Sequence, residues 1–433
     1  MSGVSILGGR IINPADGSDR CTDLHIADGR IIAIGTAPEG FHAERSIDAA
    51  DLIICPGLVD LGVHLREPGA EHKATIASEA RAAAGGGITT LCAAPDTDPV
   101  TDTPAVVELV TRRARQARLT RVMPVGALTV GLQGEHISEM AALRKAGCVA
   151  MSDGGRPVVN TLVLRRALEY AATQDLPVIL TPVDPYLTGQ AWMHEGWVST
   201  RLGIAGIPVS AETSALARYL ALVEDTGARV HFARLSTGRG AALVARAREE
   251  GLPVTADVAI HQLFLSEMDV SGFDSLCHVQ PPLRGDADRD ALRQAVADGS
   301  LKAICSDHQP HEPDAKEVTF TASEPGISGL DTLLPLALRL VDDGVLSLHR
   351  ALGMLSSGPA ELLGLNVGRI AEGEPADLCL YDPDTPWWLQ AESMRSRGRN
   401  SPFLGWEFTG QVRMTLLGGR IIFDAAAEDG LQA

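Results

Sequence analysis

Two stretches of the chain carry residue types that can begin a metal site. The stretch DLGVHLREPG places His64 directly after an apolar run, but Gly62 stands where a histidine pair spaced by one residue has its first member. The stretch ICSDHQPHE places Asp307 and two histidines after another apolar run. Histidine and carboxylate side chains bind Zn²⁺, which activates a bound water for hydrolysis. The sequence therefore indicates a candidate metal site in which the histidine pair is half present, and the rest of the chain decides whether it is a variant site or an inactive one.

These residues follow apolar runs that alternate with helical patterns through the middle of the chain. The runs with strand character are LIICPGLVDL, GITTLCAAP, RVMPVGAL, CVAMSD, PVILTP, RVHFARL, PVTADVAI and LKAICSD. Helical stretches such as TSALARYLALVEDTG lie between them, and several end in glycine, as helix C-caps do. This alternation predicts a parallel (β/α)8 barrel, with a doubly wound open sheet as the alternative.

In a (β/α)8 barrel, reactive side chains lie at the carboxyl ends of the strands. The residues expected there are His64 and Arg66 (first strand), Asp96 (second), Asp153 (fourth), Thr181 and Pro182 (fifth), Arg234 (sixth), His261 (seventh), and Asp307, His308 and His311 (eighth). We expect His261 and His308 to make structural hydrogen bonds and His231, in mid-strand, to lie in the core. His278 precedes a loop and has no spacing typical of a metal ligand.

The two ends of the chain resemble each other. Residues 6–12 read ILGGRII, and residues 416–422 read LLGGRII. The alternating stretch DLHIADGRIIAIG is typical of a β-hairpin that turns at Asp28-Gly29. Strands at both termini can pair only if the ends meet in space. We therefore predict a small β-sandwich domain from residues 1–55 and 365–433, with the barrel spanning residues 56–364.

Composition narrows the class of protein. The formal net charge of −18 argues against a nucleic-acid or anionic-membrane surface, because phosphate contacts need clustered Lys and Arg. The seven cysteines form no CxxC pair, and most sit in apolar runs, which predicts buried thiols in a reducing compartment. No apolar run reaches the roughly 18 residues of a membrane span, and the N-terminus lacks the features of a signal peptide. We expect a cytoplasmic protein with neither nucleic acid nor membrane as partner.

Longer motifs point to a known family. PGLVDLGVHLREPG, TLCAAPDTDPVTDTP, MHEGWVSTRLGIAGIPVSAE, VQPPLR, ICSDHQPHEPDAK, EPGISGLDTLLPLAL and NSPFLGWEFTG resemble the longer, bacterial type of dihydroorotase, in the amidohydrolase superfamily. The resemblance covers essentially the whole chain. Its REPG, PPLR and DHxPH elements favour dihydroorotase over hydantoinase, allantoinase or urease. It implies hydrolysis or closure of the cyclic amide of dihydroorotate, with one or two Zn²⁺ ions as cofactor.

The resemblance also implies roles for individual residues. Asp307 matches the family's metal-binding aspartate, which shuttles the proton, and His64 matches a retained metal ligand. Arg66, Asp96 and His311 match the positions that hold the substrate carboxylate. The family has asparagine at the position of Asp96, and a carboxylate there repels the carboxylate of the substrate.

The departures from the family concentrate at the metal site. Gly62, Pro182 and Arg234 stand where the family has metal-binding histidines, and the strand-four acidic pair is Asp153-Gly154, either of which can match the ligand. His64 and Asp307 are then the ligands that clearly remain, whereas a catalytic zinc needs three protein ligands. The guanidinium of Arg234 stays protonated. We expect it to pair with Asp307 or Asp153 and to replace the metal electrostatically, which leaves Asp307 in place but without function.

Three hypotheses about function follow. The first is an inactive protein similar to the noncatalytic dihydroorotase-like subunits that assemble with the aspartate transcarbamoylase catalytic chain; it needs no cofactor, and we expect a homo-oligomer as well. The second is an active, zinc-dependent cyclic amidohydrolase with an atypical site, for instance one rebuilt from His64, Cys305 and Asp307. The third is a binding module that senses a carboxylate metabolite through Arg66 and His311, unless Arg66 forms a salt bridge with Asp96 instead.

Overall fold

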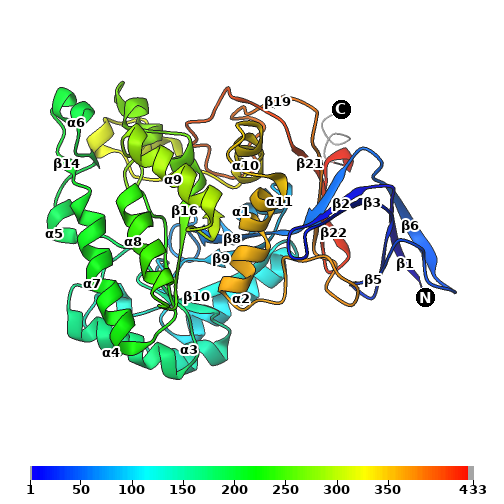
Figure 1. Ribbon diagram of the computed structural model, residues 1–433, viewed down its shortest axis with the longest axis horizontal. Coiled ribbons are helices and arrows are strands. Elements are labelled where there is room, and N and C mark those ends of the chain that lie inside the picture. The colour runs from blue at the N-terminus through cyan, green and yellow to red at the C-terminus, as the bar shows by residue number, and fades with distance from the viewer. Residues whose placement is uncertain (1, 428–433) are drawn as a thin grey trace.

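The computed structural model describes residues 2–427, and a barrel of eight parallel strands lies at its centre (Figure 1). In chain order the strands are β8 (Leu58–Val63), β9 (Ile88–Ala93), β10 (Arg121–Ala127), β11 (Ala150–Ser152), β12 (Val178–Leu180), β15 (Val230–Phe232), β16 (Val254–Ala259) and β17 (Ala303–Cys305). Consecutive barrel strands pair in parallel from β8 through β17. Past the ends of β8 and β17, the backbone N–H of His64 donates to the carbonyl of His308 over 2.9 Å. The predicted barrel is confirmed, and the open doubly wound sheet was the wrong alternative.

Helices surround the barrel, as the alternating sequence pattern predicts. They are α1 (Ile76–Gly85), α2 (Pro104–Ala117), α3 (Met140–Ala146), α4 (Thr161–Thr173), α7 (Ser210–Thr226), α8 (Gly238–Glu249), α9 (Asp286–Asp298), α10 (Leu333–Asp342), α11 (Leu348–Leu355) and α12 (Ser357–Leu362). Their starts follow local capping chemistry. At α1 the Thr75 hydroxyl accepts a hydrogen bond from the Ser78 N–H, and at α8 the Thr237 hydroxyl accepts one from the Gly240 N–H.

Small and aliphatic side chains fill the barrel interior. One buried cluster contains Leu61, Cys92, Val125, Ala150, Ile179, Ala233, Ala259, Ala303 and Cys305, which come from all eight strands or their ends. Alternate residues of a strand point to opposite faces, so the other set of strand residues packs against the helices. This layer fills the barrel beneath the side chains at the strand ends.

The connection between β12 and α7 carries an insertion for which the sequence pattern gave no prediction. It holds α5 (Pro185–Thr188), β13 (Met193–His194), α6 (Trp197–Leu202) and β14 (Gly206–Ile207). β13 and β14 pair in parallel, and Ile207 and Ala211 bury a small apolar cluster beside them. The insertion forms one wall of the barrel mouth.

Strands from the two ends of the chain form two sheets beside the barrel, and the ends meet in the second of these sheets (Figure 1). The first sheet has the order β5-β4-β1-β6 and the second the order β22-β21-β18-β7-β2-β3. Their strands are β1 (Ser2–Leu7), β2 (Arg10–Asn13), β3 (Ser18–Cys21), β4 (Leu24–Ala27), β5 (Arg30–Ile34), β6 (His42–Asp48), β7 (Ile53–Pro56), β18 (Leu378–Asp382), β21 (Gln411–Leu417) and β22 (Arg420–Asp424). β4 and β5 form the predicted hairpin, with Asp28 and Gly29 both at positive φ. A short pair, β19 (Trp387–Trp388) and β20 (Glu407–Phe408), lies between β18 and β21 in the chain.

The cysteines are buried as predicted, with one exception. Cys21, on β3, is exposed, while the other six thiols are buried, and all seven are free. Cys55 and Cys379 lie directly opposite each other on β7 and β18.

No helix in residues 2–427 is long and apolar enough to cross a membrane.

Candidate functional site

A cavity of about 370 Å³ opens at the carboxyl ends of the barrel strands. The residues that line it include His64, Asp96, Thr181, Pro182, Arg234 and Gln309. They come from strands one, two, five, six and eight of the barrel, so the predicted convergence at the mouth holds for them. The chemistry of the cavity depends on what occupies its floor.

The side chain of Arg234 lies across the floor of the cavity. Its Nη1 donates to Asp307 Oδ1 over 2.8 Å and lies 3.4 Å from His64 Nε2, while its Nη2 donates to Thr181 Oγ1 over 2.9 Å. The backbone at Arg234 is left-handed (φ 60°), and its N–H donates to Asp257 Oδ1 over 2.5 Å. The guanidinium therefore joins residues of the first, fifth and eighth strands, and the expected pairing of Arg234 with Asp307 is present.

The Arg234–Asp307 ion pair is buried. The Arg234 side chain is 11% exposed and the Asp307 side chain 1%. Burial by itself lowers the pKa of Arg234, but the adjacent carboxylate of Asp307 outweighs it, and the pKa is raised above the ordinary arginine value. The guanidinium thus remains a fixed positive charge against Asp307.

Beside the ion pair, His261 has no hydrogen-bond partner for either ring nitrogen among the described residues. Arg234 Nε and Asp307 Oδ2 are likewise buried and unpartnered there. Burial, with a further contribution from the charge of Arg234, lowers the pKa of His261 to about 4, so its ring is neutral at pH 7. The expectation that His261 makes a structural hydrogen bond was wrong.

His64 and Asp96 form a hydrogen-bonded pair at the edge of the cavity. His64 Nδ1 lies 2.6 Å from Asp96 Oδ2. Burial by itself raises the pKa of Asp96, but the charge and hydrogen bond of His64 and the charge of Arg66 outweigh it and lower the pKa to about 2. The other ring nitrogen of His64, Nε2, lies 3.4 Å from Arg234 Nη1. Both ring nitrogens of His64 therefore lie within reach of protein side chains.

Arg66 and His311 are in contact, as a shared anion site requires, but their side chains contact each other directly. Arg66 Nη2 lies 3.2 Å from His311 Nε2, and Arg66 Nε donates to the Pro310 carbonyl. Burial, the charge of Arg66 and the charge of Lys73 lower the pKa of His311 to about 3, so its ring is neutral. The alternative salt bridge from Arg66 to Asp96 is not formed, since Asp96 is turned to His64. Neither Arg66 nor His311 lines the cavity.

The strand-four acidic residue faces the backbone of the next strand. Asp153 Oδ1 accepts from the Gly155 N–H and Oδ2 from the Thr181 N–H, each over 3.0 Å. Burial raises the pKa of Asp153 to about 6, against the opposing effect of these hydrogen bonds and of Arg234. Gly154 is at positive φ in the turn that follows. Asp153 is thus satisfied by protein donors and does not pair directly with Arg234.

The side chains at this mouth do not fit a catalytic zinc ion. Such a site needs three protein ligands and an open position. Within residues 2–427, no group of three or more His, Cys, Asp or Glu side chains is placed to hold a metal. Cys305 lies in the barrel interior, where burial and the carboxylate of Asp257 raise the pKa of its thiol well above the ordinary value, so it does not complete a site with His64 and Asp307.

Comparison with known proteins decides the family. Residues 51–239 match a family model described as dihydro-orotase-like, and residues 209–422 match the amidohydrolase family. A protein of Pseudomonas aeruginosa named "Dihydroorotase-like protein" is 54% identical over 96% of this chain and 99% of its own. The chain belongs to the dihydroorotase-like family. The motifs quoted above are therefore correctly identified with that family.

Other members of the family carry a different name. A protein of Syntrophotalea carbinolica that is 44% identical over 97% of this chain and 99% of its own is named "Dihydroorotase". Among solved structures, L-hydantoinase (dihydropyrimidinase) from Arthrobacter aurescens aligns with a TM-score of 0.88 at 26% identity, covering 98% of this chain and 96% of that one. The structural similarity of the dihydroorotase-like chain to an amidohydrolase thus extends over nearly its whole length.

Sequence reasoning missed the polar groups that support the site from below and from the side. Asp257, on β16, receives the Arg234 N–H and also lies 3.0 Å from His231 Nε2. His231 is buried as predicted, but it is a polar partner of Asp257 and not simply a core residue. The signal was available, because the stretch PVTADVAI contains an aspartate in an otherwise apolar strand.

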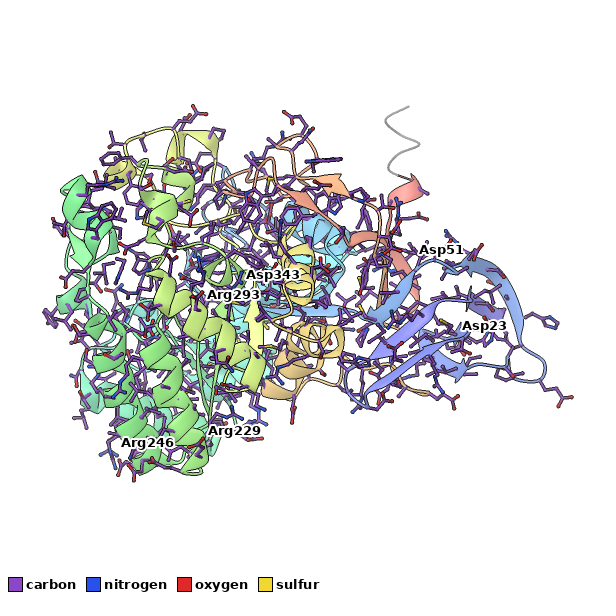
Figure 2. The ribbon with its side chains drawn as sticks, turned by 45° about the horizontal axis from the view of Figure 1, so that its top comes forward. Asp23, Asp51, Arg229, Arg246, Arg293 and Asp343 are labelled. Atoms are coloured by element: carbon purple, nitrogen blue, oxygen red, sulfur yellow. The ribbon has the colours of Figure 1, made fainter. Side chains whose placement is uncertain are left out.

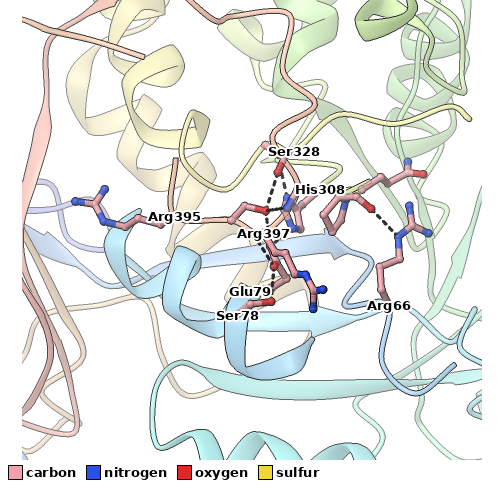
Figure 3. A network of polar contacts seen from close by, with 12 residues as sticks. Arg66, Ser78, Glu79, His308, Ser328, Arg395 and Arg397 are labelled. Carbon is pink, nitrogen blue, oxygen red and sulfur yellow. Dashed lines mark hydrogen bonds and ion pairs between the residues drawn. The ribbon is translucent and has the colours of Figure 1, made fainter. Parts of the chain in front are cut away.

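A second buried network fixes the loop that carries Asp307 (Figure 3). Glu79 on α1 accepts from His308 Nε2 over 2.8 Å, from Ser396 Oγ over 2.6 Å and from Ser78 Oγ over 2.7 Å. The Arg397 N–H also donates to Glu79 over 3.2 Å. The expected structural hydrogen bond of His308 is therefore present. The network ties helix α1, the strand-eight loop and the segment before β20 into one unit of the dihydroorotase-like chain.

Replacing Glu79 by glutamine should destabilise the fold by about 3 kcal/mol, because an amide places an N–H₂ group among donors at a fully buried position. Burial raises the pKa of Glu79, but its hydrogen bonds and the charge of His308 outweigh this and lower the pKa below 4.5. A lowered carboxyl pKa stabilises the fold above the unfolded-state value, and that contribution is lost as the pH falls through the folded-state value. Urea unfolding should therefore show the full difference from the native chain at pH 7 and a smaller one below about pH 4.

The matched control for this prediction is Glu224→Gln, on an exposed face of α7. We expect it to change the free energy of unfolding by less than about 0.5 kcal/mol. A Glu79→Gln variant as stable as Glu224→Gln would contradict the role given to the network.

Proposed function

We propose that this chain is a catalytically inactive dihydroorotase-like protein of pyrimidine biosynthesis. In this proposal it acts in the cytoplasm as an assembly partner of the aspartate transcarbamoylase catalytic chain and forms a homo-oligomer itself. The family membership supports the placement in pyrimidine biosynthesis. The resemblance to noncatalytic dihydroorotase-like subunits supports the partner.

One observation carries the inactive half of the proposal, namely the buried ion pair between Arg234 and Asp307. In a working site the aspartate must bind metal and move a proton. Here its Oδ1 accepts from a permanently charged guanidinium over 2.8 Å. A dication at this position faces the charge of Arg234 and finds His64 already bonded to Asp96. The geometry therefore favours a site whose charge balance is complete without metal.

The second candidate function is an active, zinc-dependent cyclic amidohydrolase with an atypical site. The observation in its favour is that relatives 42–44% identical to this chain are named "Dihydroorotase". For this function the Arg234–Asp307 pair has to break and a third ligand has to be recruited. His64 and Asp307 would be the first two ligands of such a site.

Zinc content and turnover separate the two candidates. Protein purified without chelator should contain less than about a tenth of an equivalent of zinc by elemental analysis, because two ligand positions do not hold the metal tightly. The same sample should give no hydrolysis of dihydroorotate above the rate without protein. Near-stoichiometric zinc together with turnover would overturn the inactive assignment and establish the second candidate.

A further inference from the structure

Several arginines on the surface of this acidic chain have a carboxylate partner. The chain carries 37 Lys and Arg against 55 Asp and Glu. Figure 2 labels Arg229, Arg246 and Arg293 on the helical side of the barrel. Their partners are Asp175 at 2.8 Å, Glu250 at 2.8 Å and Asp343 at 3.3 Å. Because acidic residues are in excess over the whole chain, a group of neighbouring exposed arginines without partners reverses the charge balance locally.

Such a group lies on α2, at the C-cap of α2 and at the first residue of β22. Helix α2 buries Val106, Val107, Val110 and Ala114 against the barrel, and its opposite face leaves arginine side chains exposed. Arg112, Arg115, Arg118 and Arg420 are exposed, and none of the four side chains has a hydrogen bond or ion pair with any other described residue. We call these four residues the arginine face.

The arginine face borders two adjoining depressions of the surface. The charged residues that line them are Arg112, Arg115, Arg118, Arg121, Arg420 and Glu108. Five positive charges thus face one negative charge, the reverse of the balance in the whole chain. Arg121 is the exception among the five, since it pairs with Asp377. The floor includes apolar groups of Ala114, Val122 and Leu417.

We propose that the arginine face docks an acidic segment of a partner protein. This inference rests on the proposed function, because it names the surface by which the assembly partner is held. Unpaired guanidinium groups with apolar floor between them match a segment that carries several carboxylates and a few apolar side chains. Arginine is enriched in protein interfaces because it forms bidentate bonds to carboxylates while its stem packs against apolar surface.

A protein fits this face better than a nucleic acid does. The binding of a nucleic acid depends on long-range electrostatic attraction, and the formal net charge of −18 repels a polyanion from the molecule as a whole. A carboxylate segment on a folded partner meets the arginine face at short range, where the local positive charge dominates within a Debye length of about 8 Å. The apolar floor also has no use in binding phosphates.

The test compares two triple variants in binding to the aspartate transcarbamoylase catalytic chain from the same organism. Arg112→Glu/Arg115→Glu/Arg118→Glu reverses the arginine face. Arg20→Glu/Arg239→Glu/Arg399→Glu makes the same change of charge at scattered, exposed arginines whose side chains form no hydrogen bond or ion pair with other described residues. Sedimentation of the full-length chains together, at low and at high salt, measures the affinity. Thermal unfolding of each variant alone verifies that it is folded. If the triple reversal of the arginine face lowers stability, the milder variant Arg115→Ala/Arg118→Ala replaces it in the binding experiment.

We expect the native chain to bind, with an affinity that falls as salt rises, and the face reversal to weaken binding at least about 100-fold, because it places like charges together. The scattered variant should stay within about threefold of the native chain. If the native chain does not bind at all, the proposed function fails. If the native chain and the face reversal bind equally well, the docking inference alone fails. It also fails if the native chain binds a 20-base-pair duplex DNA through this face, or if the reversal merely dissociates a homo-oligomer.

Discussion

A variant with three histidines restored, Gly62→His/Pro182→His/Arg234→His, should bind about one equivalent of zinc, whereas Gly62→His alone should remain below about a tenth. The single change returns one ligand but leaves the guanidinium of Arg234 bonded to Asp307. The triple change removes that charge and supplies three imidazoles beside His64 and Asp307. Elemental analysis after dialysis against zinc and then against buffer measures the difference.

The backbone at Gly62 has room for this test. A Cβ atom added there meets Cys305 Sγ at 3.4 Å and Cys305 Cβ at 3.6 Å, which is ordinary contact distance. A failure of Gly62→His to bind zinc is therefore not explained by a clash of the added Cβ atom. Appreciable zinc or dihydroorotate hydrolysis in the single variant would contradict the account of the ion pair, because it would show that Arg234 moves aside without cost.

Much of the fold was predictable, because its signals are local and repeated. Eight apolar runs alternating with helical stretches predict parallel strands, and Asp28-Gly29 predicts a hairpin from the residues alone. The pairing of β7 with both β2 and β18 was less accessible, since residues 53 and 381 are brought together only by closure of the barrel between them. The insertion with β13 and β14 gave no periodic signal because its strands are two residues long.

The site was predictable in its residue types but not in all of its contacts. Arg234 near Asp307 follows from strand order, because the ends of parallel strands meet at one rim. The partner of Asp96 could not be predicted from strand order, because His64 and Arg66 are only two residues apart after the same strand. In the structure Asp96 Oδ2 lies 2.6 Å from His64 Nδ1. His261 misled the sequence argument, because a polar residue after a strand normally finds a partner, and this one has none among the described residues.

Removal of the charge of Arg234 should destabilise the fold by about 3–5 kcal/mol, because Arg234→Met leaves the carboxylate of Asp307 buried without its partner. The second change Asp307→Asn removes that carboxylate and should recover most of the loss, to within about 1 kcal/mol of the native chain. Both positions have left-handed backbone, with φ of 60° and 48°, and asparagine tolerates that conformation. Urea unfolding of the native chain, both single variants and the double variant gives the coupling free energy directly.

An exposed pair provides the control for this cycle. Arg246 and Glu250 lie 2.8 Å apart on α8, with side chains 77% and 54% exposed, so Arg246→Met should cost less than about 1 kcal/mol. The contrast arises from solvation, since water replaces the lost partner of Glu250 but does not reach the 1%-exposed carboxylate of Asp307. If Arg234→Met is as mild as Arg246→Met, the guanidinium does not neutralise the barrel mouth, and the proposed replacement of the metal by Arg234 is wrong. If the single variant is unstable and the double variant recovers, Arg234 and Asp307 form one electrostatic unit, and regaining a metal requires that both be released together.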